Sequence, residues 1–200
     1  MTESAKTTIK VEKATQLKGA DRHDLCDAAE AAILEGGGFG WLSPPPREVL
    51  ETYWRGVLVV PERSLFLARM DGVVAGSAQL VRPTRNNEAQ AHAATLTAAF
   101  VAPWARGHGV ARKLIEAVEG TARDEGFAVL NLDLRETQTA AIALYETLGY
   151  TRWATQPYYA RVGDAWVAGH FYSKLLRAVS YTHLRAHETK TRISVGVVGG

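Results

Sequence analysis

The chain has 200 residues, 46% of them hydrophobic and 22% charged, which is the composition of one ordinary globular domain. No apolar run approaches the roughly 18 residues of a membrane-spanning helix. The formal net charge is +2, but residues 178–200 alone carry a net +2, which leaves 20 basic and 20 acidic residues in the rest. A neutral domain gives no reason to expect a nucleic acid or a membrane as a partner.

The N-terminus and the cysteine content indicate the compartment. Met1 to Lys10 is polar, which predicts that there is no signal peptide. The single cysteine, Cys26, excludes an internal disulfide and fits a reducing cytoplasm. Because Cys26 lies in a helical pattern, we expect a small buried residue there rather than a nucleophile.

Two helices are predicted in the first third of the chain, after a short strand over 9–11. Apolar residues recur at helical spacing over 21–34 and again over 47–57. The segment between them contains a glycine run and three consecutive prolines, which no regular element tolerates. This segment predicts a flexible connector, unless its aromatic residues Phe39 and Trp41 are used as a surface.

A hairpin and a long strand follow. Asp71-Gly72 separates two apolar runs, over 65–70 and 73–81, and this dipeptide favours the type I′ turn of a hairpin. The run over 93–101 predicts another strand. Pro103 ends it, because proline lacks the N–H group that a central strand needs.

The stretch after this strand predicts a phosphate-binding loop. Gly107 and Gly109 allow backbone conformations closed to other residues and remove side chains that would keep a ligand away. A helical pattern over 109–125 begins at once, with Val110 and Leu114 on its apolar face. Free N–H groups and the positive end of the helix dipole at such an N-terminus bind phosphate or pyrophosphate.

The same loop matches other motifs less well. Gly107 to Arg112 reads Gly-x-Gly-x-x-Arg, and Asp133 lies about where a dinucleotide-binding fold places its ribose-binding acid. However, Arg112 replaces the third glycine, and no βαβ pattern continues after Asp133. A P-loop needs Gly-Lys-Ser or Gly-Lys-Thr, which the sequence lacks. A tight turn without any ligand would also explain one glycine pair.

The last third predicts a strand, a helix and closing strands. The run over 127–134 is almost wholly apolar apart from Asn131 and Asp133, as in a central strand buried on both faces. A helix follows it and ends at Gly149. The closing strands are expected over 150–153, 158–162 and 166–175.

Residues 178–200 do not follow this pattern. They show no clear period, so we expect a single domain over 1–177 and a disordered or non-native tail over 178–200. His183 and His187 stand four residues apart in this segment, but no third metal ligand lies near them in the sequence. We therefore expect no metal site.

Two motifs, in this order, resemble the GNAT superfamily of N-acyltransferases. Arg106-Gly107-His108-Gly109-Val110-Ala111 looks like its acyl-CoA pyrophosphate loop, and Ala141 to Tyr150 looks like its Ala-x-x-Leu-Tyr-x-x-x-Gly-aromatic helix. The resemblance covers roughly residues 9 to 176. It implies an α/β (α+β) fold with a mixed, mostly antiparallel central sheet of about six to seven strands. About four helices would flank the sheet, and two central strands would splay apart.

The resemblance implies an enzyme that moves an acetyl group from acetyl-CoA, its co-substrate, directly to a primary amine of a small-molecule acceptor, and it leaves a homodimer open. Tyr145 matches the family tyrosine that protonates the departing thiolate. The segment between the first two helices would cover the acceptor site as a lid. The residues implied to bind acetyl-CoA are Ala99, Phe100, Val101, Arg106, Gly107, His108, Gly109, Val110, Ala111, Arg112 and Gln138.

Two positions depart from the family pattern. Gln138 stands seven residues before Tyr145, where relatives often have asparagine. Thr95 stands where many relatives have a glutamate as general base, and threonine cannot take that role. The substitutes that the sequence offers are Glu88, His92, Asp133 and Glu136.

Three functions stay open from the sequence. The first is an acetyl-CoA-dependent N-acetyltransferase. The second is a CoA-binding regulatory module without turnover, which the missing glutamate allows. The third, a dinucleotide-binding oxidoreductase, conflicts with Arg112.

Overall fold

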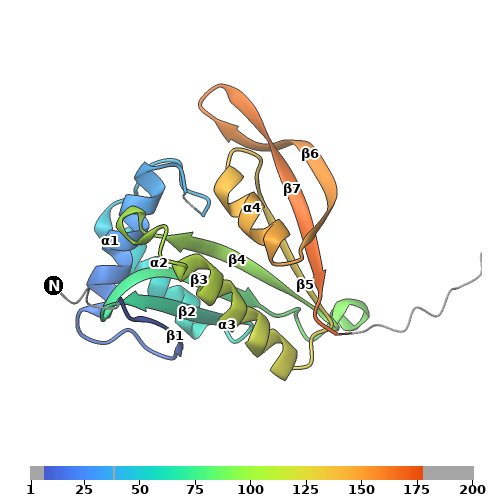
Figure 1. Ribbon diagram of the computed structural model, residues 1–200, viewed down its shortest axis with the longest axis horizontal. Helices are drawn as coiled ribbons and strands as arrows, with labels where there is room; N and C mark the ends of the chain where they lie inside the picture. The colour runs from blue at the N-terminus through green and yellow to red at the C-terminus, as the bar shows by residue number, and fades with distance from the viewer. Residues whose placement is uncertain (1–6, 38, 178–200) are drawn as a thin grey trace, which may run out of the picture.

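The computed structural model describes residues 7–37 and 39–177, and Figure 1 shows their arrangement. This part of the chain forms one seven-stranded sheet, in the order β1-β2-β3-β4-β5-β7-β6, with four α-helices. Only β4 and β5 pair in parallel. The predicted mixed, mostly antiparallel sheet with about four helices is therefore confirmed. The elements are β1 (Ile9–Ala14), α1 (Asp21–Leu34), α2 (Arg47–Val59), β2 (Arg63–Met70), β3 (Val73–Val81), β4 (Ala93–Val101), α3 (Val110–Asp124), β5 (Val129–Arg135), α4 (Thr139–Thr147), β6 (Thr151–Val162) and β7 (Ala165–Leu175).

Helices cover both faces of the sheet, and β2 shows how the sequence arranges this. Successive strand residues point to opposite faces. Leu65 and Leu67 lie in the hydrophobic cluster formed with α1 and α2, whereas Phe66 and Ala68 lie in the cluster formed with α3. All four side chains are buried, which explains why β2 is apolar without alternation.

The structure confirms the predicted hairpin of β2 and β3, including the type of its turn. Asp71 and Gly72 have φ values of 51° and 90°, as a type I′ turn requires at both central positions. The register continues from Met70 paired with Val73 to Arg63 paired with Val81, with one irregularity after Ala68. β4 pairs with the free edge of this hairpin, along β3.

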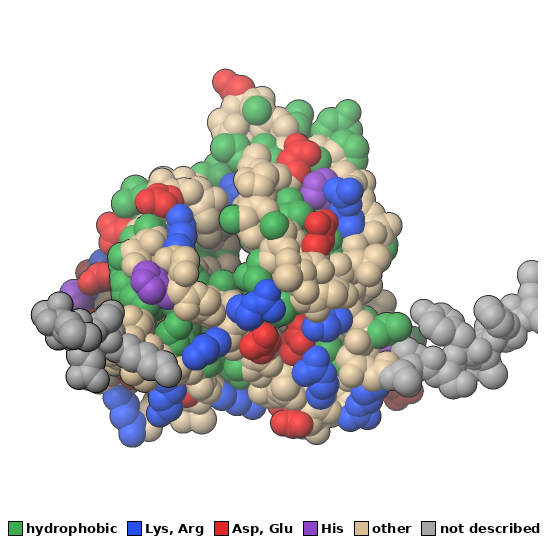
Figure 2. Space-filling view, viewed as in Figure 1, with side chains coloured by type: hydrophobic (Ala, Val, Ile, Leu, Met, Phe, Trp, Pro, Cys, Tyr) green, Lys and Arg blue, Asp and Glu red, His purple; other side chains and the backbone are tan. Residues whose placement is uncertain are grey.

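The two central strands part soon after they meet. β4 and β5 pair only through three residue pairs, the last of which joins Thr95 to Asn131. Beyond it the strands diverge, and Figure 2 shows the surface hollowed between the part that holds α1 and the part that holds β6 and β7. The prediction that β5 is buried on both faces was wrong: its residues alternate, and Asp133 is exposed. A strand that has left its neighbour no longer needs apolar residues on its open face.

The C-terminal part is one long hairpin rather than three short strands. β6 runs through Pro157 without ending, because the register with β7 shifts between Gln156 and Ala160 and so accommodates the proline. The expected tail over 178–200 lies outside the described residues. Across residues 7–37 and 39–177, no helix combines the length and the apolar character needed to cross a membrane.

Candidate active site

The gap between the diverging strands β4 and β5 is bounded on one side by β4. Beyond Thr95, this edge of β4 has no strand partner. On its other edge β4 pairs with β3, and the Ala102 N–H donates to the Ala75 carbonyl at 2.8 Å. Because successive backbone groups along a strand point to opposite edges, Val101 presents its N–H and carbonyl to the gap. Ala98 has a positive φ of 49° at the bulge opposite Ala78, so β4 bends here. Of the expected binding residues on this strand, Phe100 is buried, whereas Ala99 and Val101 are half-buried.

A glycine loop stands at the open end of β4. Gly107 and Gly109 have φ values of 79° and 81°, in the left-handed region that favours glycine. An added Cβ at either glycine would meet no protein atom within 4 Å, so the loop is open above both residues. Among the described residues, the first amide of this turn with a backbone acceptor is that of Lys113, which donates to the Gly109 carbonyl at 3.2 Å. The amides from Gly107 to Arg112 are therefore free for a ligand.

The charged residues of this loop already have partners. The Arg106 guanidinium lies 2.5 Å from the Glu35 carboxylate and donates to the Val101 carbonyl at 3.4 Å. Arg112 lies 3.8 Å from Glu116 in the next turn of α3. Both ion pairs are about half exposed to solvent, so both can open at low cost when an anion arrives.

The remaining loop residues divide into exposed and buried positions. His108 is exposed, and its Nδ1 lies 2.8 Å from the Arg106 carbonyl, so the ring is held beside the loop. Val110 is buried in the cluster beneath the loop, and Ala111 is half-buried. The apolar face of α3 thus fixes the orientation of the free amides.

Tyr145 lies on α4, the helix that follows β5, and β5 bounds the gap on the side opposite β4. Its side chain is 6% exposed and packs edge-on against Tyr150, with ring centroids 5.3 Å apart. Burial raises the pKa of the Tyr145 phenol well above its ordinary value. No hydrogen bond in the described part of the chain involves its hydroxyl. Gln138 is the half-buried N-cap residue of the same helix, and its backbone N–H donates to the Arg135 carbonyl at 3.0 Å.

The four candidate general bases lie at different places relative to the gap. Glu88 and His92 are exposed ahead of β4, at the closed end of the gap, and the His92 carbonyl accepts the first amides of the β5 segment. The Glu136 carboxylate accepts the Ala168 amide at 3.3 Å. Asp133 lies on β5 two residues beyond the last pair with β4, so it alone of the four stands on the wall of the open gap. Thr95 belongs to that last pair.

The segment between α1 and α2 packs onto the sheet through its aromatic residues. Phe39 stacks on Phe100 of β4 with centroids 5.0 Å apart, and Trp41 meets Tyr53 of α2 at 5.0 Å. Arg135 of β5 donates to the Gly36 carbonyl at 2.9 Å. Together with the Glu35 pair to Arg106, these contacts attach the segment to both walls of the gap. A connector with unused aromatic residues does not describe it.

The structure also brings together residues that the sequence did not single out. The Tyr159 hydroxyl, from β6, donates to the Asp133 carboxylate across the intervening strand. Gln79 is fully buried on β3 and donates to the Tyr53 hydroxyl at 2.8 Å. A polar glutamine inside an apolar strand was the one visible signal of these contacts, whereas nothing near Tyr159 in the sequence points to Asp133.

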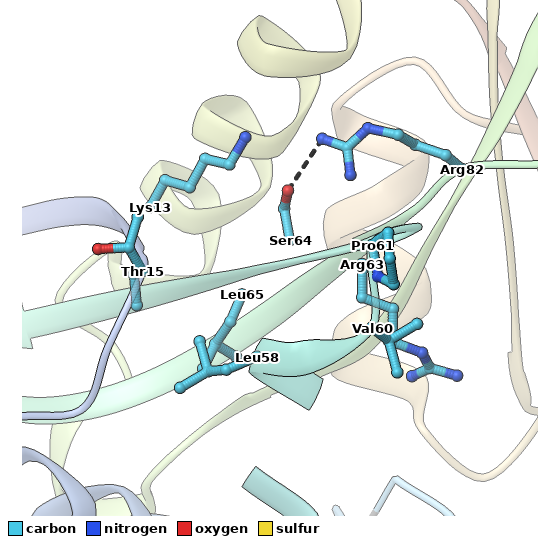
Figure 3. Close-up of a pocket in the computed structure, with 10 residues that line it drawn as sticks. Lys13, Thr15, Leu58, Val60, Pro61, Arg63, Ser64, Leu65 and Arg82 are labelled. Carbon is cyan, nitrogen blue, oxygen red and sulfur yellow. Dashed lines mark hydrogen bonds between the residues drawn. The ribbon is translucent and has the colours of Figure 1, made fainter. Parts of the chain in front are cut away.

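A second hollow lies away from this gap. A cavity of about 330 Å³ lies where β1, β2 and β3 meet. Lys13, Ser64 and Arg82 are among the lining residues that Figure 3 shows. Arg82 donates to Ser64 at 2.9 Å and pairs with Glu125 at 2.5 Å. None of the expected site residues lines this cavity, and Arg82 is already paired with a carboxylate. In the described residues no group of three or more metal-ligating side chains could hold an ion.

Residues 27–150 match the family model described as the acetyltransferase (GNAT) family. An N-acetyltransferase, named as uncharacterized, from the hisH-hisA intergenic region of Azospirillum brasilense is 68% identical over 132 residues, which are 66% of this chain and 79% of that protein. A GCN5-related N-acetyltransferase from Kribbella flavida has a TM-score of 0.69 at 26% identity, over 84% of this chain and 97% of that one. The structure of yncA from Salmonella typhimurium, solved with its cofactor acetyl-CoA, has a TM-score of 0.68 at 19% identity, over 86% of this chain and 96% of that one.

Proposed function

The chain belongs to the GNAT family of acetyltransferases, and we propose that it transfers an acetyl group from acetyl-CoA to a primary amine by direct attack. One observation carries the proposal: the gap between β4 and β5 opens beside a loop of free backbone amides. A pantetheine arm binds well to an unpaired strand edge, and a pyrophosphate binds to N–H donors at a helix start. Acetyl-CoA in the Salmonella structure of the same fold supports this assignment.

The binding residues follow from the two features. We assign the pantetheine arm to the β4 edge at Ala99, Phe100 and Val101, where Val101 offers its N–H and, once Arg106 turns to the phosphates, its carbonyl. The amides from Gly107 to Arg112 would bind the pyrophosphate, and the helix dipole of α3 would add to the attraction. Arg106 would exchange its Glu35 partner for phosphate oxygens, because a guanidinium binds phosphate in a bidentate manner. Gln138, at the start of α4, would contact the cofactor from the β5 side.

We assign Tyr145 as the general acid. Its raised pKa keeps the phenol protonated across the pH range in which the chain would work. A protonated hydroxyl without a competing partner can donate to a thiolate as it forms. Burial also disfavours a free thiolate next to it, so proton donation is most useful in this environment.

We assign Asp133 as the proton acceptor. It stands on β5 where the gap is open, and its carboxylate is exposed to an acceptor that enters there. Glu136 lies beyond the end of β5, where its carboxylate accepts the Ala168 amide of β7, and Glu88 and His92 lie at the closed end of the gap. Asp133 therefore takes the place that Thr95 leaves vacant in the family pattern.

The protons balance between these two residues. The amine nitrogen forms a bond to the thioester carbonyl carbon and becomes cationic, and Asp133 takes the proton that it then loses. The carbon–sulfur bond breaks, and Tyr145 gives its proton to the sulfur. Exchange with water returns both side chains to their starting states.

The two other functions make different demands. A regulatory module without turnover would need the site to lack a base, whereas Asp133 stands on its wall. A dinucleotide-binding oxidoreductase would need a doubly wound parallel sheet, and among the described strands only β4 and β5 are parallel.

Ligand binding and thiol release test the proposal. Acetyl-CoA and free CoA should each raise the melting temperature, whereas NAD should not. At a hundredfold excess over Kd, each bound ligand should add about 2.7 kcal/mol to the free energy of unfolding. Thiol release should depend on an added amine, in a panel of small amines and of peptides with free N-termini. Cofactor binding without amine-dependent release would favour the regulatory module, and a shift with NAD alone would favour the oxidoreductase.

A further inference from the structure

Tyr159 reaches Asp133 from a strand that is not its neighbour. β7 lies between β5 and β6 in the sheet, yet the Tyr159 hydroxyl on β6 donates to Asp133 Oδ2 on β5. The side chain therefore crosses the whole width of β7. Such a contact requires a special backbone path on β6 and free space on β7.

A bulge in β6 supplies the path. Gln156 pairs with Gly169 and Ala160 pairs with Val167, so three residues of β6 lie opposite a single residue of β7. Extra residues of this kind re-aim side chains at sheet edges. On β7 the residue left opposite the bulge is Ala168, and Glu136 satisfies it by donating its amide to the Ala168 carbonyl at 2.9 Å and accepting the Ala168 amide at 3.3 Å.

Gly169 supplies the space. A Cβ at this position would overlap the Cγ, Cδ1 and Cδ2 atoms of the Tyr159 ring, so the ring lies directly on the glycine backbone. The ring also meets Phe171 edge-on, with centroids 5.9 Å apart. Since Phe171 is the β7 partner of Asp133, these contacts direct the hydroxyl to that carboxylate.

The neighbouring tyrosine shows that this orientation is particular to Tyr159. Tyr158 is 69% exposed and packs edge-on against Trp166, with centroids 5.7 Å apart. Two adjacent tyrosines thus differ in what their hydroxyls do. Only one of them touches the wall of the gap.

We propose that Tyr159 is a positioning residue that fixes the Asp133 carboxylate for the acceptor amine, which rests on the proposed function. By donating to Oδ2, the phenol restricts the rotation of the carboxylate and leaves Oδ1 with free lone pairs. Oδ1 is then the atom that takes the proton from the attacking nitrogen.

Two charges surround the Tyr159 hydroxyl. Burial and the hydrogen bond to Asp133 raise the pKa of Tyr159 above its ordinary value of 10.0, while Arg135, two residues along β5, lowers it. Arg135 also donates to the Gly36 carbonyl, so it is held in place. Phe171, the neighbour on β7, is neutral.

The test compares Tyr159→Phe with Tyr158→Phe in the full chain. Tyr159→Phe keeps the ring on Gly169 and should lower kcat about tenfold or more, the scale of a lost hydrogen bond to a charged group. The Kd for acetyl-CoA and the melting temperature should stay unchanged. Tyr158→Phe should behave as the wild type. Wild-type kcat in Tyr159→Phe, or equal losses in both variants, would overturn the inference.

A double-mutant cycle separates positioning from packing. If Tyr159 acts through Asp133, Tyr159→Phe should cost little once Asp133→Asn is present, whereas additive losses would contradict the proposal. Nuclear magnetic resonance of labelled tyrosine gives a readout without turnover: Asp133→Asn should lower the pKa of Tyr159, while burial, the larger cause, keeps it above 10.0. An unchanged Tyr159 pKa would show that the two groups do not interact and would overturn the inference even where the double variant is too slow to assay. Absent acetyl transfer by the wild type would instead count against the proposed function.

Discussion

Tyr145 combines a buried ring with a hydroxyl that has no hydrogen-bond partner in the described part of the chain. Tyr145→Phe should lower kcat by about 10²-fold or more, the usual scale for a placed general acid. The ring would still pack on Tyr150, so the Kd for acetyl-CoA should stay nearly unchanged. The loss should shrink with an acyl donor whose thiol has a lower pKa. The measurement is kcat for both proteins with two donors, and wild-type turnover by the variant would make Tyr145 a packing residue.

Gly109 and Gly120 offer a matched pair for the phosphate loop. Gly109→Ala must hold a side chain at φ 81° and should cost about 1 kcal/mol of stability, with weaker acetyl-CoA binding because the amides shift. Gly120 lies inside α3, where an added Cβ meets nothing within 4 Å, so Gly120→Ala should stabilise by about 0.5–1 kcal/mol. Urea unfolding and calorimetric titration measure both. Equal acetyl-CoA affinity in the two variants would remove the support for the loop assignment.

Single residues were predictable from the sequence only where a local motif contains them. The glycines at 107 and 109 were expected to adopt special backbone angles, and both do. Asp133 could be named only as one substitute among four, because its advantage depends on where β5 leaves β4. Tyr159 could not be found, since its partner lies 26 residues away across another strand.

Phe39 carries the contacts of the segment between α1 and α2. Its ring meets those of Trp41, Tyr53, Trp54 and Phe100. Phe39→Ala should therefore lower the free energy of unfolding by about 2–3 kcal/mol, somewhat less than for a fully buried ring. If the segment is a lid, the KM for the amine should also rise. Denaturant unfolding and steady-state kinetics measure the two effects.

Leu42 is the control in the same segment. Its side chain is 56% exposed, so Leu42→Ala should change stability by less than about 0.5 kcal/mol. If Phe39→Ala were as mild as Leu42→Ala, the segment would be a connector after all. If Phe39→Ala changed stability alone, the segment would be part of the fold without covering the acceptor.

Elements were predictable where their period is undisturbed. The helix over 21–34 and the strand over 93–101 have the bounds that the periodicity predicts. β6 was predicted as two pieces because Pro157 interrupts its pattern, and the bulge that accommodates a proline leaves no mark of its own in the sequence. β5 was expected to be buried on both faces because its sequence is mostly apolar. That apolar content does not show that β5 loses β4 as a neighbour after Asn131.

The whole molecule is held together across elements that are distant in sequence. Arg69 on β2 donates to Glu12 of β1 at 2.9 Å and to Asp21 of α1 at 2.8 Å, which ties one edge of the sheet to the first helix. The hydrogen bond from Arg69 lowers the pKa of the Asp21 carboxyl below its ordinary value of 3.8, although burial opposes it. The pKa of Glu12 is lowered from 4.5 for the same reason.

This triad predicts how stability responds to acid. A carboxyl whose folded pKa is depressed stabilises the fold above its unfolded pKa, and the contribution is lost as the pH falls through the folded value. The unfolding free energy should therefore begin to fall near pH 4.5 and continue to fall below pH 3.8. Arg69→Met removes the cation, so the variant should be less stable at pH 6 and lose less on acidification. Urea unfolding between pH 6 and pH 3 should show the two curves converging at low pH. Parallel curves would mean that Arg69 acts through packing alone, since the charge of its partners would then make no difference.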